Sequence, residues 1–130
     1  NRQISLDVTP MQMVRQFHEV FECPIGTKPA LPSIELIELR CKFIDEERDE
    51  LDVALTNNDL VETVDALVDL LYFIYGFGVV LGVDLDAAFR EVYRSNMSKL
   101  DANGLPMRRD DGKIIKGPNY TPPNLKVFCQ

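Results

Sequence analysis

Residues 60–81 read LVETVDALVDLLYFIYGFGVVL, an apolar segment interrupted by three acidic side chains. These acids are Glu62, Asp65 and Asp69. Their spacings of three and four residues place them in one sector of a helix, about 60° wide. A helix that is apolar around the rest of its circumference is typical of one enclosed by neighbouring helices. The segment therefore predicts a buried helix with a single acidic stripe.

The segments around this helix carry the start and stop signals of further helices. Asp59 and Gly82 are suitable residues for its N-terminal and C-terminal caps. Three more helices are expected after the N-caps Thr9, Ser33 and Asp84, with ends near Phe21, Leu55 and Leu100. Four helices on short connections predict an all-α four-helix bundle, formed as a single domain over residues 1–130. A turn-rich, basic C-terminal tail follows, in which Lys113–Ile115 is a candidate short strand.

The second expected helix adds three glutamates that do not point to solvent on a helical wheel. Glu46, Glu47 and Glu50 fall within or beside its apolar arc, whereas its aspartates lie on the opposite side. Together with the acidic stripe of residues 60–81, they concentrate up to six carboxylates in one region. Two like charges about 4 Å apart repel by roughly 4 kcal/mol at an effective dielectric constant near 20. Such a cluster needs protons or cations to persist.

Divalent cations are the expected partners of this cluster. The candidate ligands are Glu46, Glu47, Glu50, Glu62, Asp65 and Asp69. Oxygen ligands favour Mg²⁺, Mn²⁺ or Ca²⁺ over zinc, and a chain whose only histidine is His18 lacks the paired Glu-x-x-His ligands of di-iron bundles. The alternative is that these acids lie on solvated helix surfaces. His18 is expected to be a packing residue rather than a base.

The net charge of −7 hides a division of the chain. Residues 1–93 hold 7 basic and 18 acidic side chains, whereas residues 94–130 hold 7 basic and 3 acidic ones. The acidic body argues against a nucleic-acid polymer or an anionic membrane as partner, because both require a basic surface. The apolar run at residues 70–83 is shorter than a membrane span. Three scattered cysteines form neither a disulfide framework nor a zinc site, so a cytoplasmic location is expected.

Basic and amide side chains near the C-terminus are candidates for contact with an anionic ligand. Asn96 and Lys99 fall on the inner face of the fourth expected helix, and Lys113 and Lys116 follow in the tail. Carboxylate-bound metal ions beside cationic side chains are the groups that phosphate chemistry requires. A frayed helix end and a solvated tail are the alternative. No Gly-rich P-loop is present, which excludes that class of nucleotide site.

Several short motifs, in order, resemble those of a known family. They are Phe17-His18-Glu19, Glu46-Glu47-Arg48-Asp49-Glu50, Asp69-Leu70-Leu71-Tyr72, Ser95-Asn96-Met97-Ser98-Lys99 and Lys116-Gly117-Pro118-Asn119-Tyr120. The second of them matches the Glu-Glu-x-x-Glu signature of the MazG-like all-α nucleoside triphosphate pyrophosphohydrolases. Within that superfamily the chain resembles the single-domain branch that is dUTPase-like and phosphoribosyl-ATP pyrophosphohydrolase-like.

The resemblance implies an enzyme that hydrolyses a nucleoside triphosphate to the monophosphate and pyrophosphate and so cleans the nucleotide pool. The expected substrate is dUTP or another deoxynucleotide, and the expected cofactor is Mg²⁺, which Mn²⁺ can replace. The implied metal ligands are Glu46, Glu47, Glu50, Asp65 and Asp69, and Glu47 or Glu46 would activate the attacking water. The implied contacts to phosphate, sugar or base are Asn96, Lys99, Lys113, Lys116 and Tyr120. A homodimer or a dimer of dimers is also implied.

Two points stay open. The family's second motif, Glu-x-x-Asp, matches Glu62-Thr63-Val64-Asp65 by its letters, yet Asp69 occupies the place of the family's Asp, and its Glu partner would fall on Ala66. Either Glu62 or Asp65 would then supply the remaining ligand. The other open point is the function itself. The alternatives are phosphoribosyl-ATP hydrolysis in histidine synthesis and a helical module that binds divalent cations without catalysis.

Overall fold

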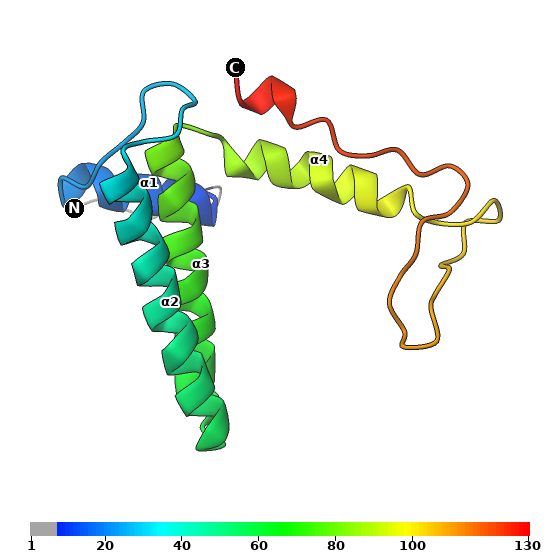
Figure 1. Cartoon of the computed structure of the whole chain (residues 1–130), viewed down its shortest axis with the longest axis horizontal. Helices are drawn as coiled ribbons and strands as arrows, with labels where there is room; N and C mark the ends of the chain where they lie inside the picture. Colours follow the sequence, from blue (N-terminus) through cyan, green and yellow to red (C-terminus); the bar gives the residue numbers. More distant parts are fainter. Residues whose placement is uncertain (1–7) are drawn as a thin grey trace. The chain divides into compact units, whose positions relative to one another are not determined.

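The computed structural model describes residues 8–130 and is all-α over that range (Figure 1). Its helices are α1 (Pro10–Val20), α2 (Ile34–Thr56), α3 (Leu60–Leu81) and α4 (Leu85–Met97), followed by the short 3₁₀ turn η1 (Lys126–Phe128). Within residues 8–130 there is no strand. The predicted all-α fold class and the predicted four helices are confirmed for the described part of the chain.

Local capping residues fix where the helices begin and end. Thr9 and Gln12 form a capping box at the start of α1, in which each side-chain oxygen accepts from the other's backbone N–H. Ser33 and Asp59 cap α2 and α3, each with one side-chain oxygen. Gly82 ends α3 with a φ of 68°, a left-handed conformation that glycine adopts without steric cost. The sequence predicts all of these caps.

α4 ends at Met97, earlier than the expected end near Leu100. Past Met97 the backbone tightens, and the Lys99 N–H donates to the Asn96 carbonyl at 3.1 Å. The Lys99 carbonyl in turn accepts from the Gly117 N–H at 2.8 Å. A contact with the later tail therefore replaces further helical hydrogen bonds, and local sequence signals do not contain such a contact.

The candidate strand at Lys113–Ile115 does not form. Arg108 and Ile114 make an isolated antiparallel bridge around a turn that contains Gly112, whose φ is 88°. The Arg109 N–H donates to the Lys113 carbonyl at 2.8 Å, and the Ile115 N–H donates to the Met107 carbonyl at 2.9 Å. The segment is therefore a short hairpin with one bridge, not a strand.

The chain divides into two compact units, of which the first ends at Leu85 and the second is Asp86–Gln130. In the first unit α2 and α3 lie side by side as an antiparallel hairpin, and α1 packs against α3 (Figure 1). The second unit holds nearly all of α4 and the tail. The expectation of a single domain over residues 1–130 stays a prediction.

The buried core of the first unit joins α1 to the C-terminal half of α3. Met11 and Val14 of α1 pack against Val79 of α3, and three partly buried side chains complete this cluster: Ile25, Tyr75 and Leu85. Gly78 permits the close packing, since a methyl group there would lie 3.2 Å from Met11 Cε and in collision with Leu85. One end of the α2–α3 hairpin is thus fixed by α1.

Most of the apolar surface of α3 is not covered within its own unit. Val64, Leu67, Val68 and Leu71 are each 47% to 52% exposed. The prediction of an enclosed helix is therefore wrong for the single chain, because α1 and α2 cover only part of it. Among the helices of residues 8–130, α3 alone has the length and composition to cross a membrane, with a mean hydropathy of 1.9. The apolar run at residues 70–83 therefore underestimates the length of the apolar helix, which begins at Leu60. Core helices of water-soluble proteins have the same length and composition.

In the second unit the tail folds back along α4. The buried Ser95 hydroxyl donates to the Thr121 carbonyl at 2.8 Å. The Arg94 guanidinium donates to Glu91 at 2.7 Å and to the Thr121 hydroxyl at 2.6 Å. Glu91 also accepts from the Asn124 N–H at 2.7 Å. These bonds attach the tail to α4.

Candidate functional site

Three carboxylates from two helices meet between α2 and α3. Glu47 and Glu50 are one turn apart on α2, and Asp69 belongs to α3. One oxygen atom of each lies within 4.8 Å of the other two. Glu47 and Asp69 are partly buried, whereas Glu50 is exposed. These three residues are called the carboxylate cluster below.

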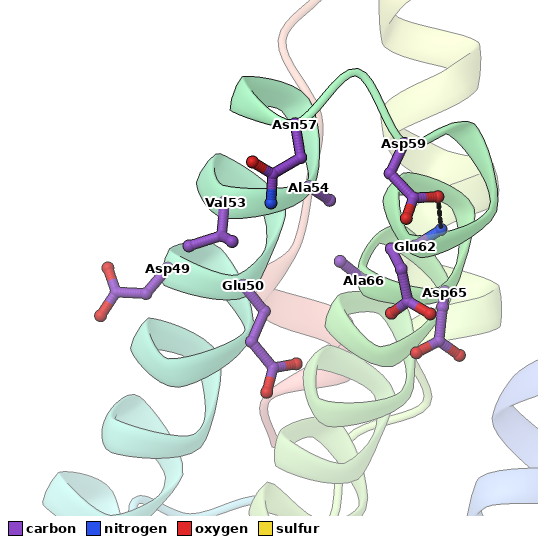
Figure 2. A pocket seen from close by; sticks show the side chains of 9 residues that line it. All are labelled: Asp49, Glu50, Val53, Ala54, Asn57, Asp59, Glu62, Asp65 and Ala66. Carbon is purple, nitrogen blue, oxygen red and sulfur yellow. Dashed lines mark hydrogen bonds between the residues drawn. The ribbon is translucent and has the colours of Figure 1, made fainter.

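An open cleft of about 500 Å³ adjoins the cluster between the same two helices. Figure 2 shows Glu50 of α2 facing Glu62 and Asp65 of α3 across this cleft. The small, buried side chains of Ala54 and Ala66 lie between the helices and allow their close approach. The acidic stripe of α3 therefore faces α2, as the helical wheel indicates.

The carboxylates of the cluster are too close together to ionise independently. Burial, a hydrogen bond with Glu50 and the charges of Glu50, Asp69 and Asp65 together raise the pKa of Glu47 to about 7. Burial also raises the pKa of Asp69, and the charges of Asp65 and Glu50 add to this effect. Asp65 thus acts electrostatically on the cluster, although it is not one of the three converging residues.

The donor set of the cluster fits a hard divalent cation. Glu47 Oε2 is buried and has no hydrogen-bond partner within residues 8–130. A buried carboxylate oxygen is costly unless a proton or a cation satisfies it. Carboxylate oxygens are the ligands that Mg²⁺ and Ca²⁺ prefer. Glu47, Glu50 and Asp69 could therefore hold a metal ion.

The other predicted metal ligands lie at two kinds of position. Glu62 and Asp65 line the cleft beside the cluster. Glu46 is exposed and belongs neither to the cluster nor to the residues that line the cleft. It precedes Glu47 by one residue, a rotation of about 100° around α2, so the two side chains leave the helix in different directions.

The predicted substrate contacts belong to the second unit, where three of them lie together. The Lys116 ammonium is 4.8 Å from the centroid of the Tyr120 ring. Gly117, the residue after Lys116, donates its N–H to the Lys99 carbonyl. A side chain at this position would come within 2.6 Å of that carbonyl oxygen, so the approach requires glycine.

The remaining two predicted contacts are exposed. Asn96 lies one turn before Lys99, near the end of α4. Lys113 follows the turn at Gly112, and its N–H donates to Asp111 at 3.1 Å. Both side chains are thus open to a ligand of the second unit.

Sequence reasoning missed one buried polar residue on the same side of α2 as the cluster. Arg40 is only 6% exposed. It precedes Glu47 by seven residues, which is two helical turns, so both residues face the same way. That spacing is the signal that could have identified it. His18, expected to be a packing residue, is 3% exposed, and its Nδ1 lies 2.8 Å from the Pro24 carbonyl oxygen.

Comparison with known proteins identifies a matching family and one relative. A family model described as phosphoribosyl-ATP pyrophosphohydrolase matches residues 14–96, which include the whole carboxylate cluster. An uncharacterized protein of Acanthamoeba polyphaga mimivirus is 38% identical over 82 residues, covering 60% of this chain and 33% of the relative. The match thus spans about a third of the length of that relative.

A solved structure shares the fold. The crystal structure of a candidate NTP pyrophosphohydrolase from Exiguobacterium sp. 255-15 aligns with a TM-score of 0.50 and 27% identity. The alignment covers 92% of each chain. The likeness therefore extends over nearly the whole length of both proteins.

Proposed function

The chain belongs to the phosphoribosyl-ATP pyrophosphohydrolase family of MazG-like, all-α NTP pyrophosphohydrolases, and from this premise we propose that it hydrolyses a nucleoside triphosphate to the monophosphate and pyrophosphate. The observation that carries the proposal is the carboxylate cluster, formed by Glu47, Glu50 and Asp69 inside the region that matches the family. The proposed substrate is dUTP or another deoxynucleoside triphosphate. The proposed role is cleaning of the cytoplasmic nucleotide pool.

Glu47, Glu50 and Asp69 are the proposed ligands of Mg²⁺, which Mn²⁺ would replace. Glu62 and Asp65 border the cleft beside them and are the candidates for further ligands. When bound, Mg²⁺ would neutralise phosphate charge and lower the pKa of a water ligand. The cleft of about 500 Å³ leaves room for a triphosphate next to the cluster.

In the proposed reaction a water molecule attacks the α-phosphorus atom. The bond from this phosphorus to the oxygen that bridges the β-phosphate breaks, and pyrophosphate leaves with the electron pair. Glu47 would orient the attacking water or accept its proton. The residues proposed to contact the nucleotide are Asn96, Lys99, Lys113, Lys116 and Tyr120.

Phosphoribosyl-ATP hydrolysis is the second candidate, and the description of the matching family favours it. This reaction breaks the same kind of phosphoanhydride bond, so the carboxylate cluster serves both candidates equally. What separates them is the group attached to the α-phosphate.

A nucleotide panel tests the proposal. Pyrophosphate release is measured for the deoxynucleoside triphosphates, including dUTP, and for phosphoribosyl-ATP, each with and without Mg²⁺. We expect Mg²⁺-dependent release from at least one deoxynucleotide. Activity on phosphoribosyl-ATP alone would select the second candidate. Release from none of them would reject the enzyme and leave a module that binds divalent cations.

We also propose that the chain forms a homodimer, or a dimer of dimers, through the apolar face of α3. Val68 and Leu71 are about half exposed and line a groove of about 270 Å³ beside Met13 of α1. An apolar face of this kind is stabilised when another protein surface covers it. A second copy of the chain would supply that surface. Lipid is the alternative, and a vesicle-binding assay would test it.

A further inference from the structure

A small cavity lies between α1, α2 and α3, apart from the acidic cleft. Its volume is about 100 Å³, and it is lined by Phe17, His18, Cys23, Arg40, Phe43, Tyr72 and Phe73. Four of these side chains are aromatic, and none is acidic. The cavity therefore offers flat apolar walls together with a few polar atoms. It is called the ring pocket below.

Arg40 is the charged residue of the ring pocket, and its Nε atom is unpaired in the described part of the chain. Its side chain is 6% exposed, and its Nε atom has no hydrogen-bond partner within residues 8–130. The ion pairs found over that range involve other arginines. The contact that supports the guanidinium is the Phe43 ring, whose centroid is 5.5 Å away. A buried guanidinium N–H without an acceptor is costly, which points to a ligand that supplies one.

His18 adds an acceptor beside this donor. Its Nδ1 is 2.8 Å from the Pro24 carbonyl oxygen, so Nδ1 carries the proton and Nε2 has a free lone pair. Burial lowers the pKa of His18, and the charge of Arg40 adds to this effect, so the ring is neutral near pH 7. A methyl group on Gly76 would lie 3.0 Å from both His18 Nε2 and Arg40 Nη1. The donor and the acceptor therefore converge on one point.

The ring pocket lies within one nucleotide length of the carboxylate cluster. Arg40 and Glu47 are two turns apart on one face of α2, which is about 10 Å along the helix axis. Asp69 and Gly76 are separated by the same two turns of α3. Phe43 of α2 and Phe73 of α3, whose ring centroids are 5.1 Å apart, lie about one turn from Arg40 and Gly76 and about one turn from the cluster. A nucleotide whose phosphates are at the cluster can place its base at the ring pocket.

We propose that the ring pocket binds the base of the substrate, that it accepts one six-membered, uncharged heterocycle, and that Arg40 determines specificity by donating to a carbonyl oxygen of this ring. The proposal rests on the proposed function and names its substrate class, a nucleotide whose pyrimidine base carries an N–H beside a carbonyl group, as uracil and thymine do. His18 Nε2 is the acceptor for the ring N–H beside that carbonyl.

The size and lining of the ring pocket favour a single six-membered heterocycle. The volume of about 100 Å³ is smaller than the dry cavity of about 150 Å³ that holds a benzene molecule, so the pocket takes at most one ring and excludes a two-ring purine. Aromatic walls favour a planar ligand, because flat rings stack. A free anion such as phosphate would gain from Arg40 but would lose its water against the four aromatic rings.

The test compares the wild type with Arg40→Met and with the matched control Arg15→Met. Arg15 is exposed on α1 and pairs only with Glu19. For each protein, kcat/KM is measured with dUTP, dCTP, dATP and dGTP in Mg²⁺, and thermal unfolding is followed without ligand. Arg40→Lys is a further variant, since it keeps the charge but loses the planar set of donors.

We expect the wild type to prefer dUTP to dCTP, dATP and dGTP, because the cytosine nitrogen beside the carbonyl carries no hydrogen and the purines have two rings. Arg40→Met should lower kcat/KM for dUTP by roughly ten- to hundredfold, mainly through KM, because a hydrogen bond to a charged donor is lost. Purine values should change little, and Arg40→Lys should fall between the two. Arg40→Met should also raise the unfolding temperature, because it removes a buried unpaired charge. An unchanged ratio of dUTP to dATP, or a lower unfolding temperature, would overturn the proposal.

A binding measurement separates failure of the pocket from failure of the enzyme. His18 is the only histidine, so its ring NMR signals report on the ring pocket without ambiguity. Uridine should shift these signals in the wild type and in Arg15→Met, but not in Arg40→Met. If no nucleotide is hydrolysed and uridine still binds in this way, the pocket stands and the proposed reaction fails. If uridine leaves the His18 signals unchanged in the wild type, the pocket assignment is wrong.

Discussion

The α2–α3 hairpin has an acidic half around the carboxylate cluster and a basic half around the ring pocket. Each half contains a buried polar atom that has no hydrogen-bond partner among the described residues. In one half Glu47 Oε2 is buried without a hydrogen-bond partner, and in the other half Arg40 Nε is buried without one. They are the buried side-chain atoms without partners among residues 8–130. The two residues share a face of α2, yet the Phe43–Phe73 pair lies between them. Opposite charges on one surface therefore do not form an ion pair, and each half needs a partner from outside the chain.

The distance explains why the halves do not compensate each other. Two unit charges about 10 Å apart attract by less than about 2 kcal/mol at an effective dielectric constant near 20. This attraction is smaller than the usual penalty for removing both charges from water. Residues held at such a cost are typical of binding sites, where stability is lost for function. A metal-bound nucleotide would satisfy both halves with its phosphates and its base.

The largest effect should come from the acidic half. Asp69→Asn keeps the shape of the side chain and removes one negative charge of the cluster. We expect a loss of roughly a thousandfold or more in Mg²⁺-dependent pyrophosphate release, because the ligand set for the cation is incomplete. The matched control is Asp45→Asn, on the exposed surface of α2. Activity within tenfold of the wild type would contradict the assignment of the cluster.

A second change tests whether the apolar face of α3 joins two copies of the chain. Val68→Asp places a charge in the apolar face of α3, and it should weaken self-association by roughly a hundredfold or more. Sedimentation across a concentration series gives the mass. The matched control is Leu55→Asp, a 57% exposed position on α2. A wild type that is monomeric at every concentration would disprove the dimer.

A third change tests the basic half by adding a methyl group while Arg40 and His18 are kept. Gly76→Ala introduces a methyl group 3.0 Å from Arg40 Nη1 and His18 Nε2, so both side chains must move. We expect KM for the preferred nucleotide to rise about tenfold, an effect of misplaced hydrogen bonds. The Mg²⁺ dependence should stay that of the wild type, because the cluster lies two turns away. A changed Mg²⁺ requirement with unaltered KM would reverse the roles of the two halves.

The acidic half should also make the metal-free protein sensitive to pH. The pKa of Glu47 is about 7 in the fold against an ordinary value of 4.5, so the folded state holds this proton more tightly than the unfolded state. The resulting stabilisation is complete below pH 4.5 and is lost as the pH rises through 7. In EDTA the unfolding temperature should therefore fall by a few degrees between pH 5.5 and 8. Mg²⁺ should reduce this difference, and Glu47→Gln should reduce it to the part that belongs to Asp69, whose pKa is also raised.

The smallest effects should come from acids outside the cluster. Glu62→Gln and Glu46→Gln should each lower kcat/KM by less than about tenfold, because neither carboxylate converges with the others. Asp65→Asn should cost more than either, since the charge of Asp65 acts on both Glu47 and Asp69. The order of the three values, measured under one condition, decides which acid completes the ligand set. An effect of Glu46→Gln as large as that of Asp69→Asn would extend the cluster.

The sequence predicts those parts of the fold that depend on neighbouring residues. Thr9, Ser33, Asp59 and Gly82 cap their helices because each acts within a few residues of itself. The end of α4 depends instead on Gly117, which bonds a carbonyl far earlier in the chain. Such a contact leaves no periodic pattern in the sequence.

The site shows the same division. A helical wheel brings Glu47, Glu50 and Asp69 into one region, but only the packing of α2 on α3 separates them from Glu46. The wheel places Arg40 on the same side of α2 as Glu47, but a lone arginine on a helix is expected to lie in solvent, so the sequence does not predict its burial. Its burial becomes apparent only when α1 covers it.

Binding of α,β-imido-dUTP, whose α–β bond is not hydrolysed, tests most directly whether one nucleotide spans both halves. We predict that its affinity requires Mg²⁺ and falls in both Asp69→Asn and Arg40→Met. Inorganic tripolyphosphate should lose affinity in Asp69→Asn alone, since it carries no base. Equal binding of α,β-imido-dUTP to the wild type and Arg40→Met, or full binding without Mg²⁺, would contradict the account.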